Sequence, residues 1–585
     1  MVFVMGLQKN YSPDVGFHLQ SAQWMVDNKT IIKQDFFTYT SMGRNYFDMQ
    51  WLYQFVLFFF NKFGGDKLLV VVNAILISTA VFIVWLRYKQ EIGSKFNTAL
   101  FVIVLLIAIQ PLSFEIRPHV FSWIYLSVLL LILSNYKAGK TKQLVFIPLV
   151  MLLWVNSHSL SVLGLVVISI FVAGDYLERK KADKNLLKYG VASLLVFFIN
   201  PYFTDGLLFP LEQFDILKGQ AYQKLYIGEL QTPFTFAEYK KEGLAYIFSP
   251  LLYMQIYSLA ALWVGVRSLI KKEITSALLI AAMFFILAMA MKNYGYFFIA
   301  TLPTVVKHYT LWLEKRNQKA RANTNRLKWI SICFPILISW LCITDGFSVL
   351  RKSPYRFGVS IDEQSLPVEA TAFLNSNKIY GKLLNHLDFG GYMMNNYPEK
   401  VFIDGRLELP SQEFFKKYFN SLKPGGLESL LIEYKPDIII FPYNKATGWW
   451  SYLISDKKNY HAVYFDGLAA IYLRNDKFKN IPQLTEENIR ISSQENIYDV
   501  ISIPKPSRYV GVLKSFFTKQ YIPIEEQNKA TFCFTYGFNN AALQYSAQGI
   551  RRATINPNNI FYNLNMYFQD KRKYNEAAIC LKRAK

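Results

Sequence analysis

The 585-residue chain is poor in the residues that build metal sites and disulfide scaffolds. It holds four cysteines and six histidines, with no CxxC pair and no Cys/His metal spacing. Cys333 and Cys342 fall in an apolar segment and are expected to be small buried residues, whereas Cys533 and Cys580 are too far apart in sequence to predict a pair. These absences exclude a disulfide-built domain and a cysteine-ligated zinc module.

Charged residues are also scarce, at 18%, whereas 52% of the residues are hydrophobic and 17% are aromatic. This balance is typical of an integral membrane protein with a soluble part attached. The formal net charge of +23 raises the question of a nucleic-acid partner. Lys and Arg, however, lie mainly in short connections between apolar segments, where they set membrane orientation, so we predict no nucleic-acid binding.

Apolar segments of near-membrane length follow one another through the first 350 residues. The opening MVFVMGLQ is too short to span a bilayer and is interpreted as the end of a first span that begins before this sequence. The chain is therefore predicted to hold ten complete spans, or eleven with the first. The ten lie near residues 67–86, 98–111, 116–134, 144–156, 159–175, 188–203, 245–266, 274–291, 295–313 and 329–346.

Lys and Arg are distributed unevenly between alternate connections. The connections of one set hold 20 of these residues and those of the other set hold 6. By the positive-inside rule the richer set is cytoplasmic, which places the opening segment and everything after residue 350 outside. The richer set is 87–97, 135–143, 176–188, 267–273 and 314–328, and the poorer set is 112–118, 157–158, 204–244 and 292–294.

The composition changes after Ser348 to that of a soluble α/β domain. The runs KLLN, KVFIDG, DIIIFP and AVYFDGLAAIYLR read as strands and alternate with helical stretches in a βαβ-like rhythm. Further on, AALQYSAQGIRRAT and NPNNIFYNLNMYFQDKRKYNEAAICLKRAK resemble about one and a half tetratricopeptide repeats, and because such repeats need neighbours, we expect the array to continue beyond this sequence. The predicted order is a transmembrane domain over 1–350 with a first external loop over 10–66, an external α/β domain over 351–475, a linker over 476–535 and repeat-like helices over 536–585.

Polar side chains gather at the outer ends of the predicted spans. Such groups are costly in lipid and mark sites or pathways, although any one of them can simply anchor or cap its helix. A carboxylate with cations in a half-dry cleft suits a transferase with a lipid-phosphate donor, in which Asp14 takes a proton from the acceptor and Arg117 and Lys292 neutralise the departing phosphate. The predicted members are Asp14, His18 and Asp35 of the opening segment, Glu115, Arg117 and His119 of SFEIRPH, Asn156 and His158 of WVNSHS, and Lys292 and Asn293 of MKNYGYF.

The opening string DVGFHLQSAQWMVDNKTIIKQDFFTYTSMGRNYFDMQWL resembles the first external loop of bacterial polytopic proteins similar to the GT-C glycosyltransferases. That loop typically reads Asp-x-x-x-His, then Asp-Pro-Phe-Ser-Tyr-Thr, then Gly and Trp-Leu. The chain departs from it at Phe36, where Pro is usual, and at Gln50, where Glu is common. Further matches are Arg-Pro-His, WVNSH, NPY at 200–202, and the FGGY and FIDGR stretches of the soluble domain.

The resemblance implies a polyprenyl-phosphate-sugar-dependent inverting glycosyltransferase of the bacterial inner membrane, acting on an envelope glycan, lipid or protein. It implies Asp14 as catalytic base. Some similar enzymes use a divalent metal; here only Asp14 and Asp35 are natural oxygen ligands in the opening segment, and no metal or other cofactor is predicted.

The soluble domain leaves two interpretations open. Gly390 and Gly391 can form a tight turn while Asp404 and Arg406 pair to fix a strand end. Alternatively, Arg406 and His386 meet the acceptor if the domain folds back over the membrane.

Two other functions compete with the transferase. A non-catalytic scaffold would recruit a protein partner through the soluble domain and the repeat-like tail. A transporter would call for broken helices in two similar halves, and no such internal repeat is seen. The predicted substrate-binding residues of the transferase are His18, Asp35, Arg117, His119, Asn156, His158, Lys292 and Arg406.

Overall fold

The computed structural model describes residues 1–95, 97–181, 183–218, 221–235, 243–316, 324–351, 353–456, 458–491 and 494–584. The chain divides into two compact units. Unit 1 comprises Met1–Gln8, Ser21–Lys33 and Tyr46–Ser339, and unit 2 comprises Lys9–Gln20, Gln34–Asn45 and Trp340–Lys585. Two pieces of the opening segment thus fold with the C-terminal part of the chain, whereas the sequence placed the whole segment in the membrane domain. Parts of the connections predicted at 204–244 and 314–328 lie outside the described residues.

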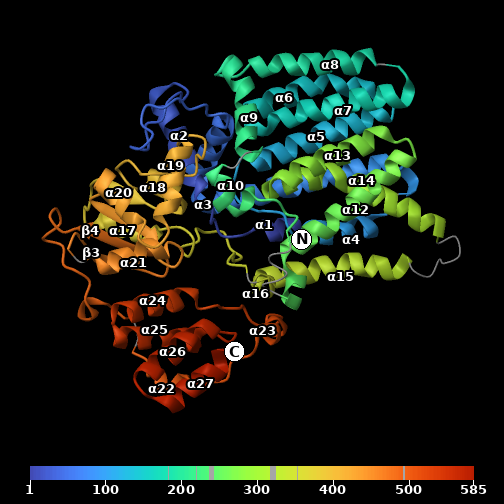
Figure 1. The fold of residues 1–585 in the computed structure, drawn as a ribbon. Helices are drawn as coiled ribbons and strands as arrows, with labels where there is room; N and C mark the ends of the chain where they lie inside the picture. Colours follow the sequence, from blue (N-terminus) through green and yellow to red (C-terminus); the bar gives the residue numbers. More distant parts are fainter. Residues whose placement is uncertain are drawn as a thin grey trace. The chain divides into compact units, whose positions relative to one another are not determined.

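Unit 1 is helical, and its helices appear in Figure 1 from blue to yellow-green. Apolar runs form these helices, and polar caps start several of them: Asn97 accepts from Leu100 N–H, and Ser249 precedes Pro250 at the start of α12. The larger helices are α3 Trp51–Ile92, α4 Thr98–Ala108, α5 His119–Lys137, α6 Ile147–Val155, α7 Val162–Arg179, α8 Lys184–Leu195, α9 Phe203–Lys218, α12 Pro250–Ile270, α13 Ile274–Met289, α14 Tyr294–Arg316 and α15 Thr324–Ile343, of which α15 continues into unit 2. Short elements between them are α1 Val2–Gly6, α10 Tyr222–Tyr226 and the 3₁₀ turns η3 Ser159–Ser161, η4 Val196–Phe198, η5 Gly228–Leu230 and η7 Met291–Asn293.

Helix α3 is longer than one membrane crossing and is broken near its middle. Gly65 has φ 58° and ψ −158°, a conformation that favours glycine, so α3 consists of two helical parts. The second part contains the span predicted at 67–86. The first part begins at Trp51, so residues 51–64 of the segment predicted as external loop over 10–66 are helical.

Three helices of the described chain are long and apolar enough to cross a membrane: Trp51–Ile92, His119–Lys137 and Ser159–Arg179. A fourth is added if Lys184–Phe198 and Phe203–Pro210, which are bent by 111°, form one span. Shorter apolar helices occupy Thr98–Ala108, Thr141–Val155, Ile274–Met289 and Lys328–Ile343. These positions agree with predicted segments, but the count of ten or eleven spans is not confirmed.

Unit 2 contains a four-stranded sheet in the order β1-β2-β4-β3. Strands β1 Leu383–Asn385 and β2 Ile438–Pro442 are parallel and wholly buried, which requires the crossover through α18 Leu387–Asn396, α19 Gln412–Ser421 and α20 Leu427–Tyr434. Strands β3 Tyr460–Phe465 and β4 Ala469–Arg474 form an antiparallel hairpin beside β2. The βαβ-like rhythm is confirmed in these runs. The remaining helices of the domain are α16 Gly346–Leu350, α17 Val368–Ser376 and α21 Thr447–Ser455.

The KVFIDG run, predicted as a strand, pairs instead with the opening segment. Thr38 forms an isolated parallel bridge with Val401, and the Val401 N–H donates to Phe37 O across 3.1 Å. Thr40 Oγ1 donates to Phe402 O, and the Tyr39 hydroxyl donates to Leu383 O of β1 across 2.8 Å. Residues 37–40 therefore belong to the α/β fold.

A set of helices completes unit 2: α22 Ile497–Val500, α23 Arg508–Lys514, α24 Ile524–Tyr536, α25 Asn539–Arg552, α26 Asn558–Asp570 and α27 Tyr574–Ala584. Helices α24 and α25 pack together, as do α26 and α27. Phe532 of α24 stacks on Phe465 of β3 with ring centres 4.2 Å apart, and Asn528 donates to Gly467 O across 2.7 Å. The segment predicted as a linker thus contains α22, α23 and most of α24, and α24 contacts the sheet. The repeat identity of the tail stays a prediction.

Candidate functional site

Asp14 begins α2 Asp14–Asn28, whereas the sequence predicted a loop. A carboxylate at a helix N-terminus faces unpaired N–H groups and is stabilised there. The half-buried side chain lies against the FIDGR stretch of unit 2: a Cβ placed on Gly405 would stand 2.3 Å from Asp14 Oδ1. The predicted catalytic carboxylate is therefore held by helix α2 on one side and by the backbone at Gly405 on the other.

Close backbone approach explains the glycines of FGGY. A Cβ on Gly391 would stand 2.1 Å from Pro13 O, and one on Gly16 would stand 2.0 Å from Gly391 O. A Cβ on Gly390 would stand 1.8 Å from Ile403 O. Gly390 and Gly391 lie inside helix α18, so the tight turn suggested by the sequence was wrong. They let α18 pack directly on the start of α2 and on FIDGR.

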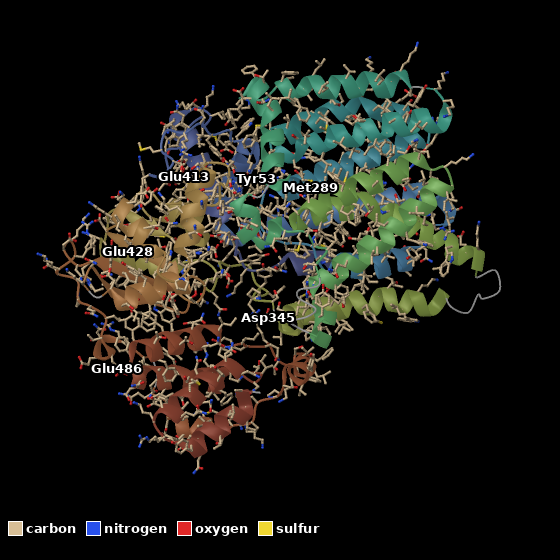
Figure 2. All side chains as sticks on the ribbon, viewed as in Figure 1. Tyr53, Met289, Asp345, Glu413, Glu428 and Glu486 are labelled. Atoms are coloured by element: carbon tan, nitrogen blue, oxygen red, sulfur yellow. The ribbon has the colours of Figure 1, made fainter. Side chains whose placement is uncertain are left out.

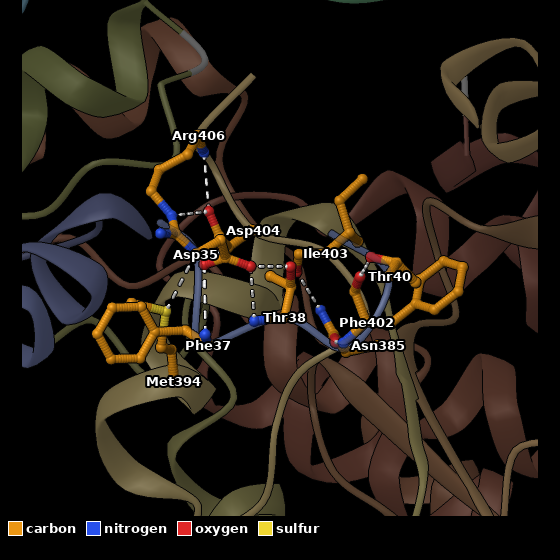
Figure 3. Close-up of polar contacts among 10 residues, drawn as sticks. All are labelled: Asp35, Phe37, Thr38, Thr40, Asn385, Met394, Phe402, Ile403, Asp404 and Arg406. Atoms are coloured by element: carbon orange, nitrogen blue, oxygen red, sulfur yellow. Dashed lines mark hydrogen bonds and ion pairs between the residues drawn. The ribbon is translucent and has the colours of Figure 1, made fainter. Parts of the chain in front are cut away.

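Asp35 and Arg406, both predicted to bind substrate, meet in a buried ion cluster of unit 2 (Figure 3). Arg406 Nη2 lies 2.8 Å from Asp35 Oδ1, and the same guanidinium contacts both carboxylate oxygens of Asp404 at 2.6 and 2.9 Å. Asp35 also accepts from Thr38 N–H and its hydroxyl, at 3.1 and 2.5 Å. The Asp404–Arg406 pair weighed from the sequence is confirmed, and Asp35 is added to it.

His18 follows Asp14 by four residues on α2, the spacing that places two side chains on one helix face. Its side chain is almost wholly buried, and its ring centre lies 4.1 Å from that of Phe17. Burial between apolar neighbours makes His18 a packing residue as well as a neighbour of the Asp14 position.

Arg117 of unit 1 lies between two carboxylates. Its Nε is 2.6 Å from Glu115 Oε2, and its Nη1 is 2.9 Å from Glu229 Oε2 in η5. The Arg117 charge, followed by that of Lys292 in η7, holds the pKa of Glu229 below its ordinary value. Arg117, Lys292, Glu115 and Glu229 together are close to neutral, so a phosphate at Arg117 must compete with the two glutamates.

Two histidines join this group. His119, the first residue of α5, lies within electrostatic range of Arg117, His158 and Lys292. His158 precedes η3, and its Nδ1 is 3.0 Å from Ser122 Oγ. Ser122 Oγ already accepts from Trp154 Nε1 across 2.7 Å, so its hydrogen is available to His158 Nδ1.

When Ser122 donates to Nδ1, the hydrogen of neutral His158 lies on Nε2; in the other tautomer Nδ1 donates to Ser122 Oγ. Burial, followed by the charge of Lys292, lowers the pKa of His158 to about 3. His158 is therefore a neutral hydrogen-bond donor near physiological pH, not a cation. The sequence predicted the convergence of Arg117, His119, His158 and Lys292, and unit 1 brings these four together.

Asn156, also predicted to bind substrate, is engaged in structural hydrogen bonds. Its Oδ1 accepts from Trp51 Nε1 across 3.0 Å, and its Nδ2 donates to Leu152 O and Ile199 O at 2.9 and 3.0 Å. It therefore ties the start of α3 to the ends of α6 and η4. This network accounts for both the Trp and the Asn of the motifs without a ligand.

An apolar cavity adjoins the Arg117 turn. Its walls come from both sides of the Gly65 break in α3 and from residues flanking Arg117 and His119. Two polar side chains reach its lining, Tyr53, labelled in Figure 2, and Asn73. The remaining lining residues are Val56, Leu57, Phe60, Leu69, Val72, Leu76, Ile116, Val120 and Phe121.

Sequence reasoning missed two carboxylates of unit 1. Glu229 lies in the connection IGELQTPF. A half-buried cation such as Arg117 needs an anionic partner, and this requirement could have pointed to Glu229. Asp48 is fully buried, its Oδ1 accepts from Gln54 Nε2 across 3.0 Å, and its backbone N–H donates to the Tyr202 hydroxyl across 2.9 Å. The sequence feature that could have indicated Asp48 is the position of an acidic residue just before the apolar helix α3.

The two oxygen ligands considered from the sequence, Asp14 and Asp35, do not form a metal site in the part of the chain that the structure describes. Among the described residues no group of three His, Cys, Asp or Glu side chains is arranged to hold one. Asp35, one of the two oxygen ligands considered from the sequence, accepts from Arg406 and from Thr38. Asp14 alone does not make a divalent-cation site.

Comparison with known proteins finds likeness in structure alone. No protein-family profile matches the sequence, and no curated protein sequence matches it. The archaeal oligosaccharyltransferase AglB from Archaeoglobus fulgidus, solved in complex with an inhibitory peptide and a dolichol-phosphate, matches with a TM-score of 0.50 and 13% identity over 96% of this chain and 82% of that chain. The apo oligosaccharyltransferase of the same organism gives a TM-score of 0.49 and 13% identity over 78% and 69% of the two chains. The match with a TM-score of 0.50 shows a likeness of fold alone.

Proposed function

We propose that the chain is a membrane glycosyltransferase that moves a sugar from a polyprenyl-phosphate donor to an envelope glycan, lipid or protein on the outer side of a bacterial inner membrane. The observation that carries the proposal is that, in unit 1, Arg117 and Lys292, balanced by two glutamates, lie near a small apolar cavity. A lipid phosphate offers one anionic group and one apolar chain, and the two features match that chemistry. The fold shared with AglB is consistent with it.

The donor phosphate is assigned to Arg117 and Lys292, with the Nε2–H of neutral His158 as a further donor and His119 beside it. These groups stabilise the negative charge that grows on the phosphate as the glycosidic C–O bond breaks. The first part of the lipid chain is assigned to the apolar side chains around Ile116 and Val120, because the cavity itself, at about 20 Å³, is too small to enclose it. Glu115 and Glu229 hold the Arg117 guanidinium in place until the phosphate arrives.

Asp14 is assigned as general base. Its carboxylate takes the proton of the acceptor group, the acceptor attacks the anomeric carbon, and the phosphate leaves with the bonding electron pair. Attack opposite the leaving group inverts the configuration. His18, four residues along the same helix, supports the position of Asp14, while Asp35, Asn156 and Arg406 act through the fold and not by touching substrate.

The repeat-like tail is proposed to bind a protein partner. It is rich in aromatic and amide side chains and packs on α24, which in turn packs on the α/β domain. This role is separate from the transfer reaction.

The experiment is a donor screen. Full-length protein in proteoliposomes is incubated with radiolabelled sugars on polyprenyl phosphate and with a membrane extract as acceptor. Transfer of at least one sugar, absent with Asp14→Asn, supports the proposal. The scaffold is supported instead if no donor is used and if two cellular results agree. Deletion of residues 536–585 must abolish the cellular function of the protein, and Asp14→Asn must preserve it.

A further inference from the structure

Helix α23 and the turn after it present apolar side chains outward and small side chains inward. Leu513 is 64% exposed and Phe517 is 89% exposed, and Tyr509 and Val510 are exposed on the same short element. Residues four apart along a helix share a face, which places Tyr509 and Leu513 together, and Phe517 is exposed in the turn that follows. A soluble surface does not usually gather aromatic and aliphatic side chains in this way.

The inner side of this element is fixed by close packing within unit 2. A Cβ on Gly511 would stand 2.2 Å from Ile555 Cγ2, and one on Gly346 of α16 would stand 2.2 Å from Ser515 Oγ. Only small side chains permit these approaches. The outward direction of Leu513 and Phe517 therefore follows from the packing of Gly511 and Ser515.

Helix α23 packs on α16, which follows α15 in the chain (Figure 1), and three contacts join the turn after α23 to the end of α15. Trp340 Nε1 donates to Phe516 O across 3.2 Å, and Gln520 N–H donates to Thr344 O across 2.9 Å. Lys519 Nζ lies 3.5 Å from Asp345 Oδ2, and Asp345 is labelled in Figure 2. The last turn of α15, the start of α16 and the α23 element are therefore one packed piece.

Helix α15 is itself a membrane candidate. The sequence predicts a span at 329–346, and Lys328–Ile343 is an apolar helix. Its large side chains are exposed, among them Trp329, Ile336 and Trp340. Since the positive-inside rule places the end of this span outside, α23 is packed at the level where α15 leaves the outer leaflet.

The charge of the element fits a lipid surface. Residues 505–519 contain Lys505, Arg508, Lys514 and Lys519 and no acidic residue. Lys514 and Lys519 are exposed beside the apolar face. Basic residues next to aromatic and aliphatic side chains on one short helix are typical of segments that lie in the plane of a membrane interface and contact anionic lipid.

We propose that Tyr509–Phe517 is an interfacial membrane anchor that inserts its apolar face between the headgroups of the outer leaflet and binds anionic phospholipid through the flanking lysines. This anchor is a second point at which unit 2 is attached to the membrane, in addition to helix α15. The proposal does not depend on transferase activity. A second copy of the chain or another protein covering the same face is the alternative that the experiment separates.

The experiment places an environment-sensitive fluorophore on the element. In full-length protein with Cys333→Ser and Cys342→Ser, Phe517→Cys is labelled with a nitrobenzoxadiazole reagent, and Leu513→Cys serves as a second position should Phe517→Cys fail to fold. Tyr574→Cys is the matched control, because Tyr574 is an aromatic residue of the same unit that is 68% exposed on α27. Each is reconstituted in vesicles of phosphatidylcholine with phosphatidylglycerol.

We expect the probe at 517 to be quenched by spin-labelled lipid and protected from aqueous iodide, with the reverse at 574. A spin label near the headgroup should quench more than one near the chain end, because such helices lie about 5–10 Å into the boundary region. Omitting phosphatidylglycerol should reduce lipid quenching at 517. Iodide quenching at 517 as strong as at 574 overturns the proposal, and so does protection from iodide without lipid quenching, which indicates a protein contact.

Discussion

Arg406 Nη2 lies 2.8 Å from Asp35 Oδ1, and both side chains are completely buried. Asp35 comes from the opening segment and Arg406 from the α/β domain, yet both belong to unit 2. The pair explains why motifs far apart in the sequence form one fold. It also gives a role in the fold to two residues that the sequence assigned to substrate.

Replacing Arg406 with Met should destabilise unit 2. The change leaves the Asp35 and Asp404 carboxylates buried without their cation, and breaking a buried ion pair from one side costs about 3–5 kcal/mol. Thermal unfolding of the purified protein measures the loss. Arg551, which is half-exposed and pairs with Glu495 at 2.8 Å, is the control, and Arg551→Met should cost less than about 1 kcal/mol. A stable Arg406→Met protein with lost substrate binding would restore the role predicted from the sequence.

Replacing Gly405 with Ala should disturb Asp14 more than the fold. The new Cβ would stand 2.3 Å from Asp14 Oδ1, so the carboxylate must move, and a displacement of about 1 Å can cost about 100-fold in rate. Gly391→Ala instead meets the backbone oxygen of Pro13, which cannot turn aside, and should lower the melting temperature. Measuring turnover and melting for both variants separates the two effects. Equal turnover in Gly405→Ala and the parent protein would show that Asp14 does not need its present position.

Arg117 and Glu229 should respond in opposite directions. Arg117→Ala should raise the apparent KM for the lipid-phosphate donor about tenfold or more, because a hydrogen bond between charged groups contributes about 1.5–3 kcal/mol. Glu229→Gln removes an anion that competes for the same guanidinium and should lower that KM. Donor titrations at saturating acceptor provide the values.

The control for this pair is Arg179→Ala. Arg179 is half-exposed, pairs with Asp175 at 3.0 Å, and lies on the predicted cytoplasmic side. Its donor KM should not change. A rise in KM for both Arg117→Ala and Glu229→Gln would mean that the ion pair only supports the fold.

The stability of the α/β domain should fall in mild acid through His386. Burial lowers the pKa of His386, against a smaller opposite effect of Asp388, and Nδ1 accepts from Asp388 N–H across 3.2 Å. A lowered pKa means that the unfolded chain takes up a proton first. Stability is thus fully present above about pH 6.5 and is lost below it by at most about 1.4 kcal/mol per pH unit.

The measurement for His386 is a series of melting curves between about pH 7 and pH 5. His386→Asn keeps an acceptor at the start of α18 and removes the titration, so its curves should depend less on pH than those of the parent protein. Charged groups facing the ring are Asp388 and Lys445, which pair with each other at 2.9 Å and remain in the variant. Parallel pH dependences for the two proteins would contradict the assignment.

Local patterns predicted the elements better than the contacts between distant segments. The runs at β1, β2, β3 and β4 read correctly, because alternation and continuous apolar stretches are local signals. KVFIDG looked equally like a strand, yet its partner is Thr38, and no local pattern reveals a partner so far away. Helix α2 was not predicted because its polar motif residues suggested a loop. The buried positions Val15, Leu19 and Ala22 nevertheless follow a helical period.

The site was predicted in part for the same reason. External turns share a membrane face, so orientation alone brought Arg117, His119, His158 and Lys292 together, and unit 1 does so. Glu229 escaped because a single acidic residue in a long connection has no pattern. The neutral state of His158 depends on its burial and on the charge of Lys292, which no reading of WVNSH supplies.

The most direct test of the central claim compares Asp14→Asn with Asp27→Asn in a single-turnover transfer assay with the donor found by the screen. Asp27 is an exposed carboxylate on the same helix, which makes it a matched control. The account predicts that Asp14→Asn loses about 100- to 10,000-fold in rate with an unchanged melting temperature, as expected for removal of a general base, while Asp27→Asn keeps the parent rate. Transfer by folded Asp14→Asn at the parent rate would contradict it.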